Sequence, residues 1–336
     1  MATILDVAEL SGVSTQTVSR VLNNHPYVSP QTRKKVEAAI TKLGYRPNPA
    51  ARALSNGKTR VLGVVSANTT LFGPASTIHA VQNSARESGY SISLYSLSSI
   101  DIGQILVAVD ELLHSGVDGL LLNIPTSISL IQLKSALSDS PVILLENENH
   151  LNIPSVNVDQ YEGARIAVRH LVEHGHRNIA HIAGPQDWFD AKRRYQGWRD
   201  ELKKYNPDKS PSVTGDWSAE SGYAGMKKLL RTGGFTAIFA ANDAMALGAL
   251  KYLTEKKLDV PGDLSVIGFD DISESSYFIP ALTTIKQDFQ ALGTAAIDLL
   301  LSRIRGEKIP NEPINIKPSL VERHSVGKAS KAIHPS

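Results

Sequence analysis

The chain has 336 residues, of which 42% are hydrophobic, and a formal net charge of +2, values that are ordinary for a globular protein of two or three domains. It contains no cysteine, which excludes disulfides, thiolate metal sites and a cysteine nucleophile. No apolar run approaches the roughly 18 residues of a membrane span, and residues 1–10 do not look like a secretory signal, so we expect a cytoplasmic protein without a membrane partner.

The charge is distributed unevenly along the chain. Residues 1–57 contain seven lysines and arginines and three acids, 7 − 3 = +4, which leaves −2 for the remainder. A small basic segment on a near-neutral body suggests a module that binds a polyanion.

The first 45 residues predict three short helices. Apolar residues recur at helical spacing over residues 4–10, 15–22 and 30–43. Thr3, Ser14 and Ser29 are suited to cap the three N-termini, and Gly12 and Gly44 to end the first and third helices. Two short helices joined by a turn have the form of a helix-turn-helix.

Residues 46–59 are predicted to be a linker. Pro47 and Pro49 interrupt helical structure, whereas the alanine-rich residues 50–54 have the composition of one or two helical turns. Because so short a helix is unstable alone, we expect it to order only when something supports it.

From residue 61, apolar segments alternate with amphipathic ones of about ten residues or more, which predicts parallel strands covered by helices on both faces. The predicted strands are residues 61–65, 92–97, 119–124, 142–145, 179–183, 237–241 and 264–269. This number of strands favours two α/β lobes over one. Ligands of such folds bind beyond the carboxyl ends of the strands.

The second helix carries side chains that suit DNA bases. Gln16 and Arg20 lie four residues apart on its exposed face, where glutamine suits adenine and arginine suits guanine in the major groove. Short polar residues near the helix starts suit phosphates: Ser14, Ser19, Asn23, Ser29 and Thr32. The alternative is an ordinary solvated surface.

Long stretches of the chain resemble the lactose-repressor family. They are residues 6–23 (DVAELSGVSTQTVSRVLN), 28–36, 44–48, 215–219 (GDWSA), 241–248 (ANDAMALG), 268–271 (GFDD) and 280–289 (PALTTIKQDF). The resemblance implies an all-α helix-turn-helix head plus an α/β two-lobed core like that of periplasmic binding proteins, with parallel sheets and helices on both faces.

The resemblance also implies domain boundaries. The helix-turn-helix domain spans residues 1–45, the hinge with its short helix 46–59, the effector-binding and dimerisation domain 60–328, and a flexible tail 329–336. Lobe 1 would comprise about 60–158 and 289–316, and lobe 2 about 159–286 and 318–328.

By the same resemblance, Thr15, Gln16 and Arg20 hold the principal base-reading positions. Asn48 and Ala51 join the DNA contacts, and Leu54 wedges into the minor groove at the operator centre, where an apolar side chain can unstack a flexible step. A family member that shares these motifs has tyrosine where Thr15 stands, so we expect a different operator sequence.

A homodimer is predicted. The two half-sites of a pseudo-palindromic operator require at least two heads. Tetramers of the family depend on a C-terminal leucine-repeat helix, which residues 327–336 do not contain.

The resemblance places a sugar effector at the ends of the core strands, because hydroxyl partners and aromatic faces suit a carbohydrate. The residues are Leu71, Pro74, Thr77, Asn123, Glu146, Asp190, Arg194, Trp217, Asn242, Asp270, Gln287 and Phe289, with Trp188 near the rim. Taken singly, each has an alternative role without a ligand: Asp270 as the cap of the next helix, and Trp217 as part of the hydrophobic core. A family member has aspartate where Glu146 stands and serine where Asp190 stands. These differences leave open a disaccharide or another glycoside as the effector, in place of a β-galactoside.

We therefore predict a non-enzymatic repressor of a carbohydrate-utilisation operon that a sugar releases from its operator. It would need no cofactor and would reside in the bacterial cytoplasm, on the nucleoid when bound to operator. The alternatives are a regulator that uses a corepressor, a sugar-binding protein without a DNA role, such as one that feeds a transporter, and an enzyme of sugar metabolism.

Two kinds of catalytic motif bear on whether the chain is an enzyme. His170-Leu-Val-Glu-His174 matches a zinc-protease motif, but Gly175 ends the helix at once, so we expect no metal site there. The glycine-rich phosphate motifs are missing, and no nucleophile with its base can be named, so we expect no catalytic residues.

Overall fold

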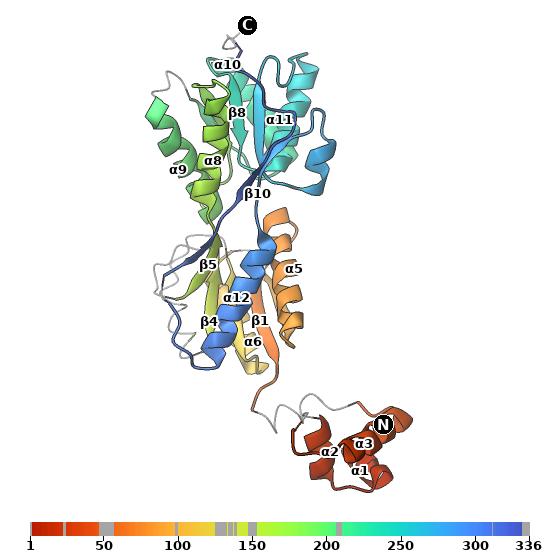
Figure 1. Cartoon of the computed structure of the whole chain (residues 1–336). Coiled ribbons are helices and arrows are strands. Elements are labelled where there is room, and N and C mark those ends of the chain that lie inside the picture. The colour runs from red at the N-terminus through yellow and green to blue at the C-terminus, as the bar shows by residue number, and fades with distance from the viewer. Residues whose placement is uncertain are drawn as a thin grey trace. The chain divides into compact units, whose positions relative to one another are not determined.

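The computed structural model describes residues 2–22, 25–46, 57–97, 100–124, 133, 137, 140–146, 153–205, 210–310 and 312–330. They form two compact units, Met1–Arg60 and Val61–Ser336, which we call the head and the core (Figure 1). The predicted hinge helix and most of the predicted tail lie outside the described residues.

The head is built from three helices, α1 (Ile4–Ser11), α2 (Thr15–Leu22) and α3 (Pro30–Leu43). Thr3 and Asp6 form a reciprocal capping box at the start of α1, and Ser29 caps α3 by accepting from the Thr32 backbone N–H at 3.1 Å. Gly12 and Gly44 end α1 and α3 in the left-handed conformation, as expected.

The apolar faces of the three helices close one small core. Its buried members are Val7, Ala8, Val18, Val21, Val36 and Ala39. Because α2 turns its valines into this core, its polar face is left outside, which confirms the predicted helix-turn-helix arrangement.

Lobe 1 of the core has a six-stranded sheet with the order β11-β5-β4-β3-β1-β2. The strands are β1 (Val61–Ala67), β2 (Ser91–Leu97), β3 (Gly119–Asn123), β4 (Val142–Leu145), β5 (Ser155–Val158) and β11 (Ile314–Ile316). Helix α6 (Ile102–His114) packs on one face, and α5 (Phe72–Glu87) and α12 (Phe289–Ile304) pack on the other.

Lobe 2 has a second six-stranded sheet with the order β12-β10-β9-β8-β6-β7. The strands are β6 (Ile179–Ala183), β7 (Ser212–Thr214), β8 (Ala237–Ala240), β9 (Ser265–Asp270), β10 (Thr283–Lys286) and β12 (Ser319–Val321). Helices α8 (Gln160–Glu173) and α9 (Phe189–Leu202) cover one face, and α10 (Ala219–Thr232) and α11 (Asp243–Glu255) cover the other. Two 3-10 turns are also present, η1 (Lys203–Tyr205) and η2 (Ser273–Tyr277).

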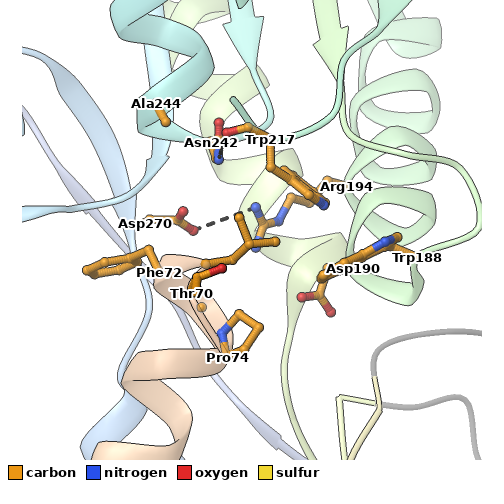
Figure 2. Close-up of a pocket in the computed structure, with 12 residues that line it drawn as sticks. Thr70, Phe72, Pro74, Trp188, Asp190, Arg194, Trp217, Asn242, Ala244 and Asp270 are labelled. Atoms are coloured by element: carbon orange, nitrogen blue, oxygen red, sulfur yellow. Dashed lines mark hydrogen bonds and ion pairs between the residues drawn. The ribbon is translucent and has the colours of Figure 1, made fainter. Parts of the chain in front are cut away.

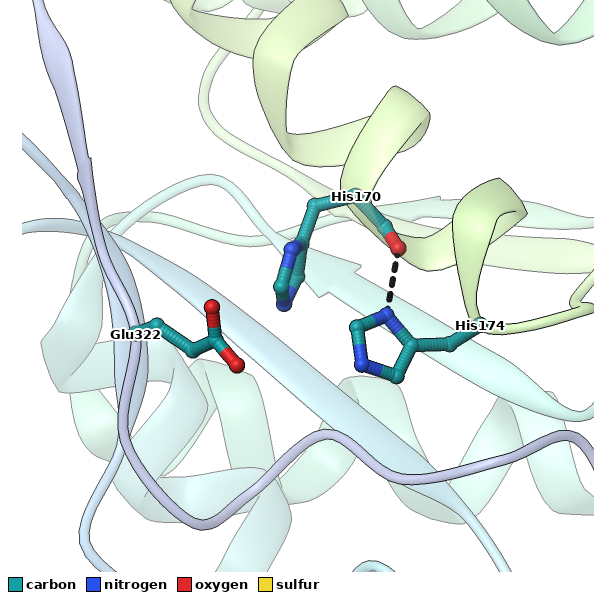
Figure 3. A group of neighbouring side chains, drawn as sticks. All are labelled: His170, His174 and Glu322. Atoms are coloured by element: carbon teal, nitrogen blue, oxygen red, sulfur yellow. Dashed lines mark hydrogen bonds between the residues drawn. The ribbon is translucent and has the colours of Figure 1, made fainter.

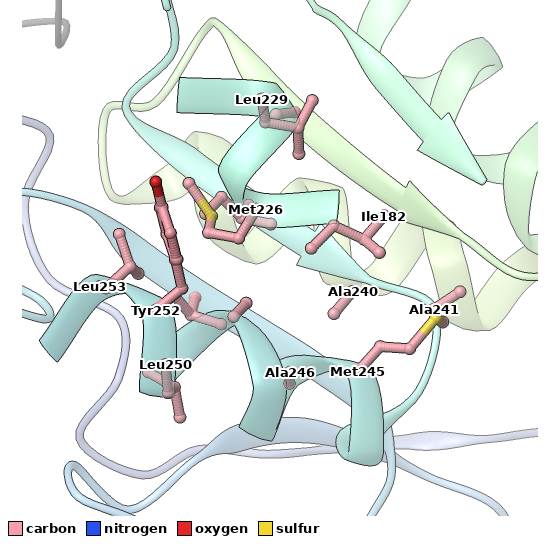
Figure 4. Close-up of a cluster of buried hydrophobic side chains, with 14 of the residues drawn as sticks. Ile182, Met226, Leu229, Ala240, Ala241, Met245, Ala246, Leu250, Tyr252 and Leu253 are labelled. Carbon is pink, nitrogen blue, oxygen red and sulfur yellow. The ribbon is translucent and has the colours of Figure 1, made fainter. Parts of the chain in front are cut away.

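The α10–α11 side of lobe 2 contains a large apolar cluster. Met226 of α10 and Ala246 and Leu253 of α11 meet Ile182 and Ala240 of the sheet there (Figure 4). Both lobes therefore have a buried layer on each face of the sheet, as the alternating pattern predicted.

The two lobes are joined where the chain crosses between sheets, at residues 158–160, 286–289 and 316–319. These crossings place the carboxyl ends of parallel strands from both sheets near one another, which is where such folds bind ligands.

All seven predicted strands are present, with ends within two residues of those expected. One expectation needs correction, because β12 pairs antiparallel with β10 and the second sheet is only mostly parallel. The strands that the pattern missed are β5, β7, β10, β11 and β12, which have three or four residues each and contain polar side chains. The predicted β4 and β8 are as short as β5 and β10 but entirely apolar, so the polar residues concealed the missed strands.

No helix in the described part of the chain combines the length and the hydrophobicity that spanning a membrane requires.

Candidate functional site

The head presents the polar face of α2 to solvent. Gln16 and Arg20 are exposed, and Thr15 and Ser19 are half-buried. Ser14 caps α2 by accepting from the Thr17 backbone N–H at 3.2 Å. At the start of α3, Ser29 is exposed and Thr32 is half-buried. Four further predicted DNA contacts lie outside the described residues: Asn23, Asn48, Ala51 and Leu54.

The core contains a cavity of about 220 Å³ between its lobes. Figure 2 shows residues of lobe 1, such as Phe72 and Pro74, facing residues of lobe 2, such as Arg194 and Asp270. The lining residues are Thr70, Leu71, Phe72, Gly73, Pro74, Trp188, Asp190, Arg194, Trp217, Asn242, Ala244 and Asp270. Since both lobes contribute, a ligand in the cavity would bridge them.

Aromatic rings form part of this lining. The rings of Trp188 and Trp217 meet edge to face with centroids 5.7 Å apart, and both side chains are less than 10% exposed. At the lobe 1 edge, Phe72 packs edge-on against Phe289, the first residue of α12. The cavity therefore offers flat apolar faces beside its polar groups.

Arg194 is the central polar residue. It is 3% exposed, and its Nη1 donates to the Ala241 carbonyl at 2.5 Å and lies 3.6 Å from Oδ1 of Asp270. Its guanidinium carbon lies 3.8 Å from the centroid of the Phe269 ring. These contacts fix the guanidinium in one orientation at the cavity wall.

A buried chain of hydrogen bonds runs behind Arg194 and crosses between the lobes. Arg194 Nε donates to Gln160 Oε1 at 2.8 Å, and Gln160 Nε2 donates to Gln287 Oε1 at 2.8 Å and to Glu146 Oε2 at 3.4 Å. Gln287 Nε2 then donates to Asp270 Oδ1 at 2.7 Å. Because Gln160 and Gln287 stand at two of the crossings, this chain connects the cavity to the connections between the lobes.

Burial disfavours the charged forms of the carboxyls around the cavity. It raises the pKa of Asp270 to about 6, although the Arg194 guanidinium opposes the shift. Burial also raises the pKa of Glu146, and the nearby Asp190 carboxylate raises it further. The pKa of Asp190 is raised by burial as well and lowered by Arg194. Three buried carboxyls with pKa values above their usual range, mainly because of burial, thus surround Arg194.

Two polar atoms of the lining lack partners. Of six buried side-chain N and O atoms without a hydrogen bond among the described residues, Asp190 Oδ1 and Trp217 Nε1 belong to the cavity. One is an acceptor and the other a donor. A buried polar group without a partner is costly, so a ligand with hydroxyl groups would satisfy both.

The backbone is strained at the same place. Glu146, Trp217 and Asp270 adopt positive φ of 50°, 75° and 114°, and they are three of the seven non-glycine residues that do so in the described chain. Such strain persists where the surroundings enforce it, and it clusters at functional sites.

Eight of the residues expected to contact the effector line the cavity: Leu71, Pro74, Trp188, Asp190, Arg194, Trp217, Asn242 and Asp270. The other five are not among the lining residues. Glu146 and Gln287 belong to the hydrogen-bonded chain behind it, Phe289 packs on Phe72, and Asn123 Nδ2 donates to Ser66 Oγ at 3.0 Å. Thr77 is buried within α5.

Sequence reasoning missed several residues. Thr70, Phe72, Gly73 and Ala244 also line the cavity, and Gln160 connects Arg194 to both Glu146 and Gln287. Thr70 and Phe72 flank the predicted Leu71, and Gly73 precedes the predicted Pro74, so the turn after β1 was the available signal. Nothing in the pattern around Gln160 marks it, because its role depends on a crossing that only the fold creates.

Comparison with protein-family models gives two matches. Residues 3–48 match the model described as bacterial regulatory proteins, lacI family, and residues 168–326 match a periplasmic binding protein-like domain.

Curated and solved relatives match nearly the whole chain. The lactose operon repressor of Escherichia coli (strain K12) is 38% identical over 323 residues, 96% of this chain and 89% of that protein. The HTH-type transcriptional repressor PurR of Histophilus somni (strain 2336) is 37% identical over 97% of this chain and 99% of its own.

Among solved structures, the lac repressor dimer bound to operator and the anti-inducer ONPF superposes with a TM-score of 0.89 at 37% identity, covering 97% of this chain and 99% of that one. A complex of the transcriptional regulator CelR with cellobiose superposes with a TM-score of 0.71 at 31% identity. The match covers 97% of this chain and 100% of that one.

Proposed function

We propose that this chain, which belongs to the lacI family of bacterial regulatory proteins, represses a carbohydrate-utilisation operon. It would leave its operator when a sugar binds in the cleft. The head supplies the DNA-binding part of this proposal, with Gln16 and Arg20 facing the major groove from α2. The core supplies the sensor.

The unpartnered polar atoms of the cavity carry the sugar assignment. A sugar hydroxyl both donates and accepts, so one hydroxyl can donate to Asp190 Oδ1 and another can accept from Trp217 Nε1. The C–H faces of the ring can pack on the neighbouring aromatic side chains. The lac repressor and CelR complexes, solved with ONPF and cellobiose, support a small ligand in this fold.

Release from DNA would follow from the position of the cavity. A ligand that touches Pro74 of lobe 1 and Arg194 of lobe 2 favours one orientation of the lobes over another. Gln160 and Gln287 stand at crossings between the lobes and would rearrange with that change. The coupling free energy between the cavity and the DNA-binding head cannot exceed the difference in sugar-binding free energy between the two orientations.

The test begins by selecting pseudo-palindromic duplexes from a random pool with the purified chain. Fluorescence anisotropy then follows the selected complex at one fixed salt concentration while galactosides, glucosides, disaccharides and sugar phosphates are titrated in. Release by one sugar supports the proposal. Tightening of the complex by a ligand would instead establish a corepressor, and a chain that selects no duplex yet binds a sugar would be a binding protein without a DNA role.

Arg194→Ala should prevent release without weakening operator binding. Loss of a buried, charged hydrogen-bonding group should lower sugar affinity about 10- to 100-fold, measured by quenching of the fluorescence of Trp188 and Trp217 at the cavity. Arg193→Ala is the matched control, because that side chain stacks on Tyr161 and bonds Gln196 outside the lining. Equal sugar affinities for the two variants would contradict the assignment of Arg194.

A further inference from the structure

One cluster of metal-ligating side chains lies away from the cleft. His170 and His174 are one helical turn apart at the end of α8, and Glu322 follows the last residue of β12 (Figure 3). One potential ligand atom from each residue lies within 4.8 Å of the others. We propose that these three side chains bind a zinc ion.

His170 supplies a ligand atom that the fold leaves unused. The residue is 5% exposed, and its buried Nε2 has no hydrogen-bond partner. Figure 3 shows its ring between the His174 ring and the Glu322 carboxylate. His176, two positions beyond His174, differs in that both of its ring nitrogens are engaged, by Thr236 and Ser265. His181 Nε2 is also buried without a partner, but among the described residues only His170 has both a second histidine and a carboxylate with ligand atoms within 4.8 Å.

His174 is already oriented as a ligand. Its Nδ1 donates to the His170 carbonyl at 2.8 Å, which leaves the Nε2 lone pair available. Metal-bound histidines typically donate their second nitrogen to a carbonyl in this way. As the C-cap of α8, His174 also sits at the negative end of the helix dipole, which favours a cation.

Glu322 completes the set with a negative charge. Two imidazoles and a carboxylate are a ligand set of zinc, with one coordination position left for water. Ligand atoms of a tetrahedral zinc lie about 3.3 Å apart, so the exposed Glu322 side chain would move inward to close the site. From the sequence we expected no metal site at His170 and His174, because Gly175 ends the helix. The sequence could not reveal that Glu322, 148 positions after His174, lies beside them.

The site is separate from the effector cleft. Helix α8 begins at Gln160, in the hydrogen-bonded chain behind the cavity, and its 14 residues extend about 20 Å along its axis. A bound zinc would join the end of α8 to the segment after β12, within lobe 2. Such a zinc would bridge two segments of lobe 2 and would not line the cavity.

Isothermal titration with ZnCl₂ tests the proposal on the untagged, full-length chain after treatment with a chelator. We expect one zinc per chain, no heat from MgCl₂, and affinity lowered at least 10-fold in His174→Ala and in Glu322→Gln. His324→Ala is the control, because it removes an exposed histidine two residues from Glu322.

A thermal scan provides the second readout. Zinc should raise the Tm of the wild type and of His324→Ala, and raise that of Glu322→Gln less, because this variant has lost a ligand. Glu322 is exposed, so the variant should fold without zinc. Absence of zinc binding by the wild type, or equal zinc affinity in His174→Ala and His324→Ala, would overturn the proposal.

Discussion

Asp243 is the carboxyl that the fold isolates most completely from water. Its Oδ1 accepts from the Thr284 hydroxyl at 2.6 Å and its Oδ2 from the Ile272 backbone N–H at 3.0 Å, and the residue is fully buried. Burial, followed by repulsion from Asp270, raises the pKa of Asp243 to about 8. The folded chain therefore keeps a proton on this residue at pH values where the unfolded chain has lost it.

This pKa predicts that stability falls as the pH rises. The contribution of Asp243 is fully present below pH 3.8 and is lost as the pH approaches about 8, with a slope of at most about 1.4 kcal/mol per pH unit. Urea denaturation at pH 5, 6, 7 and 8 should show this slope in the wild type and a flatter profile in Asp243→Asn. Asp298→Asn, on the exposed side of α12, should retain the wild-type slope. An unchanged slope in Asp243→Asn would show that another group is responsible.

At the scale of elements, glycines set the distance between α10 and α11. A Cβ added at Gly248 would lie 1.8 Å from the carbonyl oxygen of Ala219, a backbone atom that cannot rotate away. The cluster of Figure 4 forms because these two helices approach so closely.

Gly248→Ala should therefore lower the free energy of unfolding by about 3 kcal/mol, at the upper end of the usual effect of overpacking. Gly73→Ala serves as the control, because no heavy atom lies within 4 Å of its added Cβ. Urea denaturation compares the free energies of unfolding of the two variants. Equal values for Gly248→Ala and Gly73→Ala would show that the close approach of α10 and α11 does not depend on Gly248.

Helix α2 is the element predicted to read DNA. Gln16→Ala and Arg20→Ala should each weaken binding to the selected operator by about 1–3 kcal/mol relative to a scrambled duplex, because only base contacts distinguish the two. Lys42→Ala, which removes an exposed charge from the last turn of α3, should affect both duplexes alike. Fluorescence anisotropy at fixed salt measures the ratio of the affinities for the selected operator and the scrambled duplex. If this ratio were unchanged in Arg20→Ala, base reading by α2 would be contradicted.

At the scale of the whole molecule, the core exposes large apolar side chains. Tyr277 and Ile279 are 85% and 89% exposed, and Leu247 of α11 is 42% exposed. Side chains of this kind suit burial against a second copy of the chain.

We predict a dimer of this 36.3 kDa chain. Light scattering should give twice the chain mass, and Ile279→Asp should shift the equilibrium towards the monomer, whereas Thr254→Ala, which removes only a hydroxyl, should not. A tetramer, or a wild-type monomer at micromolar concentration, would contradict the prediction.

The sequence by itself determined the helices of the head, seven of the twelve described strands and the two-lobed α/β class. These features are local, since caps, glycine stops and apolar periodicity act within one or two helical turns. The eight lining residues of the cavity were implied by the resemblance to the lactose-repressor family. The tertiary structure decided the rest. The short polar strands form only because neighbours in the sheet pair with them, Gln160 gains its role only where the lobes cross, and Glu322 meets the α8 histidines only through folding. The physical reason is that contacts between residues distant in the chain leave no periodic signal, because they depend on where the packed sheets bring their ends together.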